Sequence, residues 1–424
     1  MQNISKINSL MRARASHVEL AKKVDPATHH LTISQKMQIV SRRDRMGRTK
    51  PGALRVLAAS LVLLVLVIVG GAVRSHALNT MQQKPLVPVG ENEVQFSFAG
   101  DLMVGRYVQT YGEKKGYGEI YSCVKPLWEN SSLVFANLEC AILNGDKDDY
   151  PEADKLVIHG TRDGLKAAVD AGINVFSVAN NHAVDYGRTA LREMLESITE
   201  FGAEYAGAGA NWEEAPSYRV LDADGMKVGY IACTSFVPPH FAATVDDYGV
   251  CSTNNSRTYR NLLKASLESD VTIAYVHFGQ ENVPTVTDAE RKIAHQLIES
   301  GADVVIGCHP HVLQPVEFYK NGIIFYSLGN FVFDQGQRPA RNTALLQMNV
   351  NRETGAVVFT LIPMHIDEFR PHVTDNPLYL SQIQDVLTES LPEGSYTITE
   401  LGLIQSRSSS ICTNKCILPQ KEVL

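Results

Sequence analysis

The chain has 424 residues, of which 44% are hydrophobic and 20% are charged, and this composition excludes a disordered chain. Its length allows one large domain or two ordinary ones. The formal net charge is −7, but residues 1–50 carry 11 Lys and Arg against 3 Asp and Glu. That is a net of +8, which leaves −15 for the remainder. A basic N-terminus followed by an acidic remainder indicates that the two parts face different surroundings.

Residues 1–53 show no sustained apolar period, and we interpret them as a basic cytoplasmic tail that contacts anionic membrane lipid. Such a tail is also compatible with nucleic acid, but the membrane is the simpler partner, so we expect no nucleic acid. The next feature is an uncharged run of 18 residues, 56–73, close to the minimum for a membrane-spanning helix.

The charges around this run predict its orientation. Several arginines precede it and only Arg74 follows closely, so the positive-inside rule places the N-terminus in the cytoplasm. We expect a single-pass cell-membrane protein with a transmembrane helix over 54–73, a linker over 74–93 and an extracytoplasmic C-terminal domain. The alternative is a signal peptide cleaved after Ala77, although the run exceeds the usual signal core of about 7–15 residues.

An alternating α/β pattern begins at Val94 and predicts a domain over residues 94–370, followed by a peripheral extension over 371–424. Short apolar runs rich in Val, Ile and aromatic residues predict buried strands. These runs cover residues 95–99, 133–136, 175–179, 271–276, 304–307 and 323–327. Helices are predicted over 161–172, around 191–198, and from the capping box formed by Thr287 and Glu290 to Gly301.

Polar side chains follow five of the predicted strands. They are Asp101, Glu139, Asn181 with His182, His277, and His309 with His311. Ligand sites in open α/β sheets lie just beyond the carboxyl ends of strands, so we expect these groups to converge. Because alternate residues of an extended chain share a face, His309 and His311 are expected to point the same way. The alternative is that these are ordinary strand-end residues bonded to backbone.

The mixture of carboxylate, amide and imidazole groups favours Mn, Fe or Zn as the divalent metal. Seven groups are too many for one tetrahedral zinc, and they suit two metals about 3.5–4 Å apart that share a carboxylate. An imidazole that binds no metal could then protonate a leaving group.

Six motifs in order carry a resemblance to a known family. They lie at residues 98–106, 137–139, 179–187, 277–281, 307–314 and 327–331. Together they resemble the CapA family, the poly-γ-glutamate capsule-synthesis group within the calcineurin-like metallophosphoesterase superfamily. The resemblance covers residues 94–365 and implies a metallophosphoesterase-like layered β-sandwich flanked by helices, here preceded by the transmembrane helix.

The resemblance also implies roles for individual residues. The metal ligands it implies are Asp101, Glu139, Asn181, His277, His309 and His311. Among these, Glu139 stands where the superfamily usually has a bridging Asp. His182 matches the catalytic histidine that binds no metal, and Asp185 either orients it or caps the next helix. Met103 occupies the position of a ligand histidine, so one of the two metals would lose a ligand.

Four further residues are candidates for binding substrate. Arg106 is expected either to hold an anionic group or to form a surface salt bridge. Glu281 is expected to support His277 or to be solvated. Gln314 and Asn330 are expected either to shape the site or to satisfy loop backbone.

Two functions from different classes follow. The first is a metal-dependent hydrolase or transferase that acts outside the membrane in capsule synthesis or export. Its substrate would be an anionic polymer or a phosphoester. A variant of this function is a metallophosphoesterase that acts on another substrate. The second is a non-catalytic subunit that binds or exports the polymer. The sequence has no Gly-rich phosphate loop ending in Lys-Ser/Thr, so we expect other capsule-synthesis membrane proteins to supply any ATP-dependent step.

Overall fold

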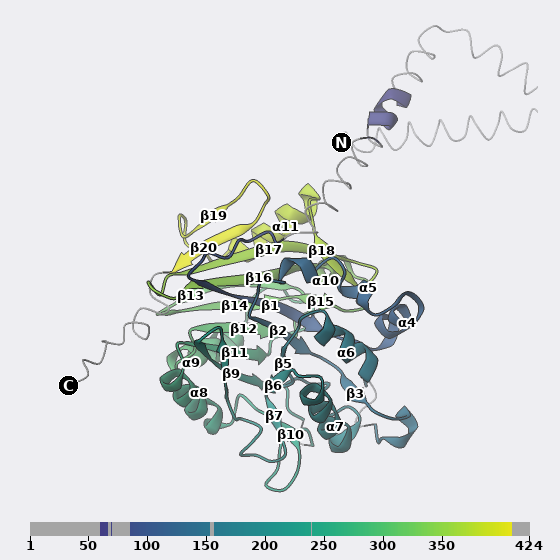
Figure 1. The fold of residues 1–424 in the computed structure, drawn as a ribbon, viewed down its shortest axis with the longest axis vertical. Helices are drawn as coiled ribbons and strands as arrows, with labels where there is room; N and C mark the ends of the chain where they lie inside the picture. Colours follow the sequence, from purple (N-terminus) through teal and green to yellow (C-terminus); the bar gives the residue numbers. More distant parts are fainter. Residues whose placement is uncertain (1–59, 67–68, 70–84, 153–156, 239, 409–424) are drawn as a thin grey trace, which may run out of the picture. The chain divides into compact units, whose positions relative to one another are not determined.

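The computed structural model describes residues 60–66, 69, 85–152, 157–238 and 240–408 (Figure 1). It divides into two units, Met1–His76 and Ala77–Leu424. In the first unit the described residues are helical. Among all residues described, no helix combines the length and apolar character needed to cross a membrane. The predicted tail over 1–53 lies outside the described residues, as does most of the predicted span over 54–73 and of the linker over 74–93.

A ten-stranded sheet forms one half of the second unit. Its main path runs β19-β20-β17-β16-β1-β2-β5-β6, with β15 paired to β1 and β18 paired to β17. The strands are β1 (Glu93–Leu102), β2 (Leu133–Leu138), β5 (Val175–Ser177), β6 (Glu204–Ala206), β15 (Asn330–Val332), β16 (Asn342–Asn351), β17 (Val357–Asp367), β18 (Arg370–Val373), β19 (Tyr396–Ile398) and β20 (Ile404–Ser408). Strands β1, β2, β5 and β6 are parallel, so their carboxyl ends lie at one edge.

A six-stranded sheet with the order β13-β14-β12-β11-β9-β8 forms the other half. Its strands are β8 (Arg219–Ala223), β9 (Met226–Thr234), β11 (Val271–His277), β12 (Val304–Cys308), β13 (Leu313–Tyr319) and β14 (Gly322–Leu328). Strands β9, β11, β12 and β14 are parallel. Two small sheets pair β3 (Ala141–Leu143) with β4 (His159–Thr161), and β7 (Ala208–Gly209) with β10 (Gly249–Val250).

The two large sheets pack face to face through a shared apolar core. Phe98 and Phe135 of the first sheet belong to one buried cluster with Tyr230 and Tyr275 of the second. The ring centroids of Phe135 and Tyr230 are 5.2 Å apart. Every residue of β11 is buried, which explains why its sequence is a continuous apolar run and does not alternate.

Helices cover the outer face of each sheet (Figure 1). Leu165 of α6 (Arg162–Asp170) and Met194 of α7 (Gly187–Glu200) share a cluster with Phe176 of the first sheet. On the second sheet, α8 (Ser256–Glu268) and α9 (Asp288–Glu299) bury Leu262 and Leu297. Further helices are α4 (Arg106–Lys115), α5 (Gly118–Tyr121) and α10 (Arg338–Arg341), with 3-10 turns at Lys125–Leu127 and Lys147–Asp149. The α/β class is confirmed, and the two sheets with their outer helices form a layered arrangement.

Local signals in the sequence explain where several helices begin and end. Thr287 Oγ1 accepts a hydrogen bond from Glu290 N at 3.2 Å, and Glu290 Oε2 accepts one from Thr287 N at 2.6 Å, which confirms the predicted capping box. Gly301, just beyond the end of this helix, has a φ of +111°. That left-handed conformation costs glycine little, so the helix stops there.

The C-terminal residues up to Ser408 continue the layered unit. Strand β20 pairs with β17, and β19 pairs with β20. Helix α11 (Pro377–Thr388) places Ile383 and Leu387 in the core between the two sheets. Residues 371–408 therefore form part of the larger sheet and of the core.

Candidate metal centre

Parallel strands of both sheets deliver the predicted ligands to one place. Asp101 is the penultimate residue of β1, Glu139 directly follows β2, and His277 ends β11. His309 and His311 follow β12. All five side chains are buried. Asn181 is half-buried, and its Oδ1 lies 2.8 Å from His277 Nε2.

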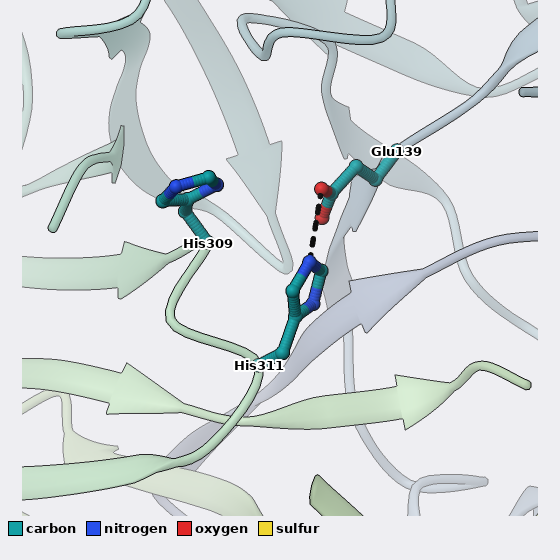
Figure 2. A group of neighbouring side chains, drawn as sticks. All are labelled: Glu139, His309 and His311. Atoms are coloured by element: carbon teal, nitrogen blue, oxygen red, sulfur yellow. Dashed lines mark ion pairs between the residues drawn. The ribbon is translucent and has the colours of Figure 1, made fainter. Parts of the chain in front are cut away.

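Glu139 lies at the middle of this arrangement. Its Oε1 is 3.5 Å from His311 Nε2 and 3.8 Å from His277 Nε2. Figure 2 shows the Glu139 carboxylate and the His311 ring pointing toward one another, with the His309 ring to their left. Two three-residue groups have ligand atoms within 4.8 Å of one another: Glu139, His309 and His311, and Asp101, Glu139 and His277. Glu139 is common to both, as a carboxylate shared between two metals would be.

Two buried atoms of the centre, Glu139 Oε1 and His309 Nδ1, have no hydrogen-bond partner among the described residues. Leaving such an atom unpaired costs about 1–3 kcal/mol. Glu139 belongs to both ligand groups and His309 to one of them, and both unpaired atoms are oxygen or nitrogen donors of the kind that bind transition metals. The donor set therefore fits a divalent metal better than it fits the protein alone.

Burial and close charges shift the pKa values of the carboxyl groups in opposite directions. Burial raises the pKa of Glu139 well above its usual range, and the neighbouring Asp101 raises it further. Burial also raises the pKa of Asp101. The contacts of Asp101 with His311, Asn137 and the backbone N–H of His309 outweigh burial, so the pKa of Asp101 is lowered. A cation beside Glu139 would favour its charged form.

Two of the imidazoles are held neutral. Burial, together with nearby His309 and His311, lowers the pKa of His277 well below the usual value. Burial and the nearby His311 lower the pKa of His309 to about 4. Burial alone would lower the pKa of His311 as well, but the contacts of His311 with Asp101 outweigh burial and raise this pKa. Neutral imidazole is the form that binds metal.

The turn that carries His309 and His311 differs from the expected extended strand end. Both residues have positive φ angles, +96° and +58°. Such left-handed conformations cost non-glycine residues about 1–3 kcal/mol each. The ring centroids of His309 and His311 are 5.9 Å apart.

His182 is oriented by Asp185. Its Nδ1 lies 2.7 Å from Asp185 Oδ2, and the same oxygen accepts a hydrogen bond from Ile158 N at 2.7 Å. Within the described chain, helix α7 begins with no side-chain cap, so of the two roles considered for Asp185 the structure favours orientation of His182. The other ring nitrogen, Nε2, lies 3.2 Å from Asn181 Nδ2.

The four candidate substrate residues have different surroundings. Arg106 forms a two-contact ion pair with Asp334 at 3.0 and 2.6 Å, and its side chain is 40% exposed. Glu281 is exposed, and its charge contributes to raising the pKa of Glu139. Gln314 donates to Val283 O and Glu290 Oε1, whereas Asn330 Oδ1 lies 2.9 Å from His311 Nδ1.

Met103, which stands at the position of a ligand histidine in the superfamily's first motif, is completely buried. Its Sδ accepts a hydrogen bond from Gly105 N at 3.0 Å. This local contact occupies the thioether and adds no strong donor to the centre.

Sequence reasoning did not assign roles to three neighbours of the centre. Phe236, which is half-buried, lies with its ring centroid 4.2 Å from that of His309. Asn137 and Asn180 are fully buried and hydrogen-bonded to the centre or to its supporting turn. The signal for Asn137 was present, since it lies two residues before Glu139 on a strand and so shares its face.

The sequence matches the family described as bacterial capsule synthesis protein PGA_cap over residues 95–335. A capsule biosynthesis protein CapA of Bacillus anthracis is 29% identical over 373 residues, covering 86% of this chain and 88% of the relative. A PGA biosynthesis protein CapA of Bacillus subtilis (strain 168) is 33% identical over 279 residues, covering 65% of this chain and 72% of the relative.

Solved structures show a weaker likeness. A phosphatase from Mycoplasma pneumoniae is 15% identical with a TM-score of 0.41, covering 69% of this chain and 98% of the other. A 5′-nucleotidase precursor from Thermus thermophilus is 14% identical with a TM-score of 0.34, covering 66% of this chain and 54% of the other. Likenesses at this level say nothing about the activity of this chain.

Proposed function

Because this chain belongs to the PGA_cap family of bacterial capsule synthesis proteins, we propose that it is a metal-dependent hydrolase or transferase acting in poly-γ-glutamate capsule synthesis or export. Its substrate is the anionic polymer or a phosphoester. The six sequence motifs support a metallophosphoesterase type of chemistry, since their polar residues are those found at the centre.

The observation that carries this proposal is the position of Glu139. It is buried, belongs to two ligand groups at once, and has an oxygen without a hydrogen-bond partner in the described part of the chain. If Glu139 had a purely structural role, this buried oxygen would remain without a hydrogen bond, and protein cores normally avoid the free-energy cost of such an atom. Two divalent metals held by the two ligand groups would account for all three features.

The ligands of the proposed metals are Asp101, Glu139, Asn181, His277, His309 and His311. Bound there, the metals would supply Lewis acidity and an activated nucleophile. Asn330 holds the His311 ring through Nδ1, which leaves Nε2 facing Glu139.

His182 is the proposed general acid. Its Nδ1–H donates to Asp185, and this bond fixes the tautomer and the ring plane. The Nε2 atom lies 3.2 Å from Asn181 Nδ2, at the edge of the ligand set, and only the doubly protonated ring, with a proton on Nε2 as well, would deliver a proton to a leaving group. Phe236 packs against the His309 ring.

Charge supports a requirement for metal. The chain beyond residue 50 carries a net −15, which repels an anionic polymer. Arg106 is already paired with Asp334 and does not offset this repulsion by itself. Divalent cations at the centre would supply the missing positive charge.

We also propose that the chain is anchored in the cell membrane by residues 54–73, with its N-terminus in the cytoplasm. The uncharged run and the arginines before it support this topology. An anchored domain outside the membrane would meet a growing polymer where other capsule-synthesis membrane proteins release it.

A non-catalytic role in binding the polymer is the second candidate, and Met103 is the observation that favours it. Its sulfur is engaged by Gly105, so Asp101, Glu139 and His311 are left with no further strong donor from this segment. A metal held weakly there would bind carboxylate groups of a polymer without supporting turnover.

The test uses the full-length chain, stripped of metal and then reloaded with Mn²⁺. We expect hydrolysis of poly-γ-glutamate or of a chromogenic phosphodiester by the reloaded protein and little by the stripped protein. His309→Ala with His311→Ala should remove both activity and metal, whereas His372→Ala, a partly exposed histidine of β18, should remove neither. Polymer binding by a metal-loaded protein that hydrolyses neither substrate would favour the second candidate.

A further inference from the structure

Asn137 and Asn180 connect the carboxylates of the centre to the turn that carries His182. Asn137 Nδ2 donates to Asp101 Oδ1 at 2.8 Å and lies 3.3 Å from both Glu139 Oε2 and His277 Nδ1. Asn137 Oδ1 accepts from Asn180 Nδ2 at 3.2 Å. Both side chains are completely buried, so water does not replace these bonds.

The contacts of Asn180 define which way both amides face. Its Nδ2 also donates to Leu138 O at 2.7 Å, and its Oδ1 accepts from His182 N at 3.1 Å. A reversed Asn180 amide would place an oxygen against two carbonyl oxygens. With Asn180 fixed, Asn137 can only present its NH₂ group to Asp101 and Glu139.

We propose that Asn137 and Asn180 form an amide relay that positions the metal ligands and couples them to the His182 turn. The relay turns the NH₂ group of Asn137 toward the two buried carboxylates, Asp101 and Glu139. A reversed Asn137 would instead set an amide oxygen against Asp101 and Glu139, and these ligands would then move apart. The inference rests on the metal centre of the proposed function and adds two positioning residues that bind no metal themselves.

The substitution Asn180→Asp isolates the relay. A carboxylate at this position keeps the acceptor for His182 N but has no hydrogen to donate to Asn137 or to Leu138 O. Asn137 then loses the bond that fixes its orientation. Loss of a residue that orients metal ligands typically costs 10–100-fold in metal affinity, and we expect a loss of about that size for Mn²⁺.

Asn349→Asp is the matched control. Asn349 of β16 is also buried, its Oδ1 accepts from Gln95 Nε2, and its Nδ2 donates to Pro88 O and Glu93 Oε2. The same substitution therefore removes two donated bonds and keeps one accepted bond, at a position paired with the opposite end of β1. It should lower the thermal unfolding temperature without changing Mn²⁺ affinity.

The experiment measures the Mn²⁺ dissociation constant of the full-length chain and the visible absorption spectrum of its Co²⁺ form. Asn180→Asp should weaken Mn²⁺ binding about 10–100-fold and change the Co²⁺ spectrum. Asn137→Ser should do the same, and the double variant should bind no more weakly than Asn137→Ser alone, because the relay acts through Asn137. If Asn180→Asp does not fold, Asn137→Ser provides the affinity comparison.

The outcomes separate the relay from the proposed function. Wild-type Mn²⁺ affinity and an unchanged Co²⁺ spectrum in folded Asn137→Ser or Asn180→Asp overturn the relay alone. An equal loss of affinity in Asn349→Asp overturns it too, since the effect would then follow general destabilisation. Failure of the wild-type chain to bind any metal overturns the proposed function instead.

Discussion

Replacing His182 and Asp185 separates the acid from the residue that orients it. His182→Ala removes the proposed proton donor without removing a proposed metal ligand. General acid catalysis is typically worth about 10²–10⁴-fold, and turnover should fall by that factor while metal content stays at the wild-type level.

Asp185→Asn should lower turnover less than His182→Ala does, and the hydrogen bonds of Asp185 give the approximate size of the loss. The bonds from His182 Nδ1 and Ile158 N both go to one oxygen, Oδ2. An asparagine with its oxygen at this place keeps these two bonds and loses the charge. A bond to a charged group contributes about 1.5–3 kcal/mol and a neutral one about 0.5–1.5 kcal/mol. The difference, about 1–1.5 kcal/mol, corresponds to roughly a 5- to 13-fold loss of turnover.

The assay follows initial rates of hydrolysis for the two variants and the wild type at matched metal content. Wild-type turnover in His182→Ala would remove this residue from the mechanism and leave the centre as a binding site. A loss in Asp185→Asn as large as that in His182→Ala would show that the charge of Asp185, and not its geometry, is the dominant contribution.

Three further predictions concern metal, pH and topology. His309→Ala with His311→Ala should abolish most bound transition metal while circular dichroism shows the fold retained; wild-type metal content in this variant would exclude both residues as ligands. Burial lowers the pKa of His365 to about 4, so the folded state keeps this imidazole neutral while the unfolded state takes up a proton below about pH 6.5. The free energy of unfolding should therefore fall between pH 6.5 and pH 4, and His365→Gln should flatten that part of a pH series of urea denaturation curves. Protease added to intact cells should remove the domain beyond residue 94 and leave the basic tail protected, and a chain released whole into the medium would contradict the anchor.

The strand ends and their polar residues were predictable from the sequence. Buried parallel strands have a distinctive continuous apolar pattern, and Asp101, Glu139 and His277 stand at their carboxyl ends. Sequence spacing thus predicts the convergence of these residues at one edge. The capping box at Thr287 was predictable for a similar reason, since it depends on residues only three positions apart.

Other parts of the centre depend on tertiary contacts that local patterns do not encode. The positive φ angles of His309 and His311 occur in residues that rarely adopt them, and the surrounding fold imposes them. The bond between Asn137 and Asn180 joins residues 43 positions apart in the sequence. The pairing of β20 with β17 likewise joins distant segments, and its five residues carry little pattern of their own.

The central claim is that Glu139 is shared by two divalent metals, and metal stoichiometry tests it most directly. The full-length chain, purified without chelator, should contain transition metal by elemental analysis and take up two equivalents of Mn²⁺ per chain on titration. Glu139→Gln should lose affinity for both equivalents, because the shared oxygen is weakened for each. Absence of bound metal in the wild-type chain at millimolar Mn²⁺, or two undiminished equivalents in Glu139→Gln, would contradict this account.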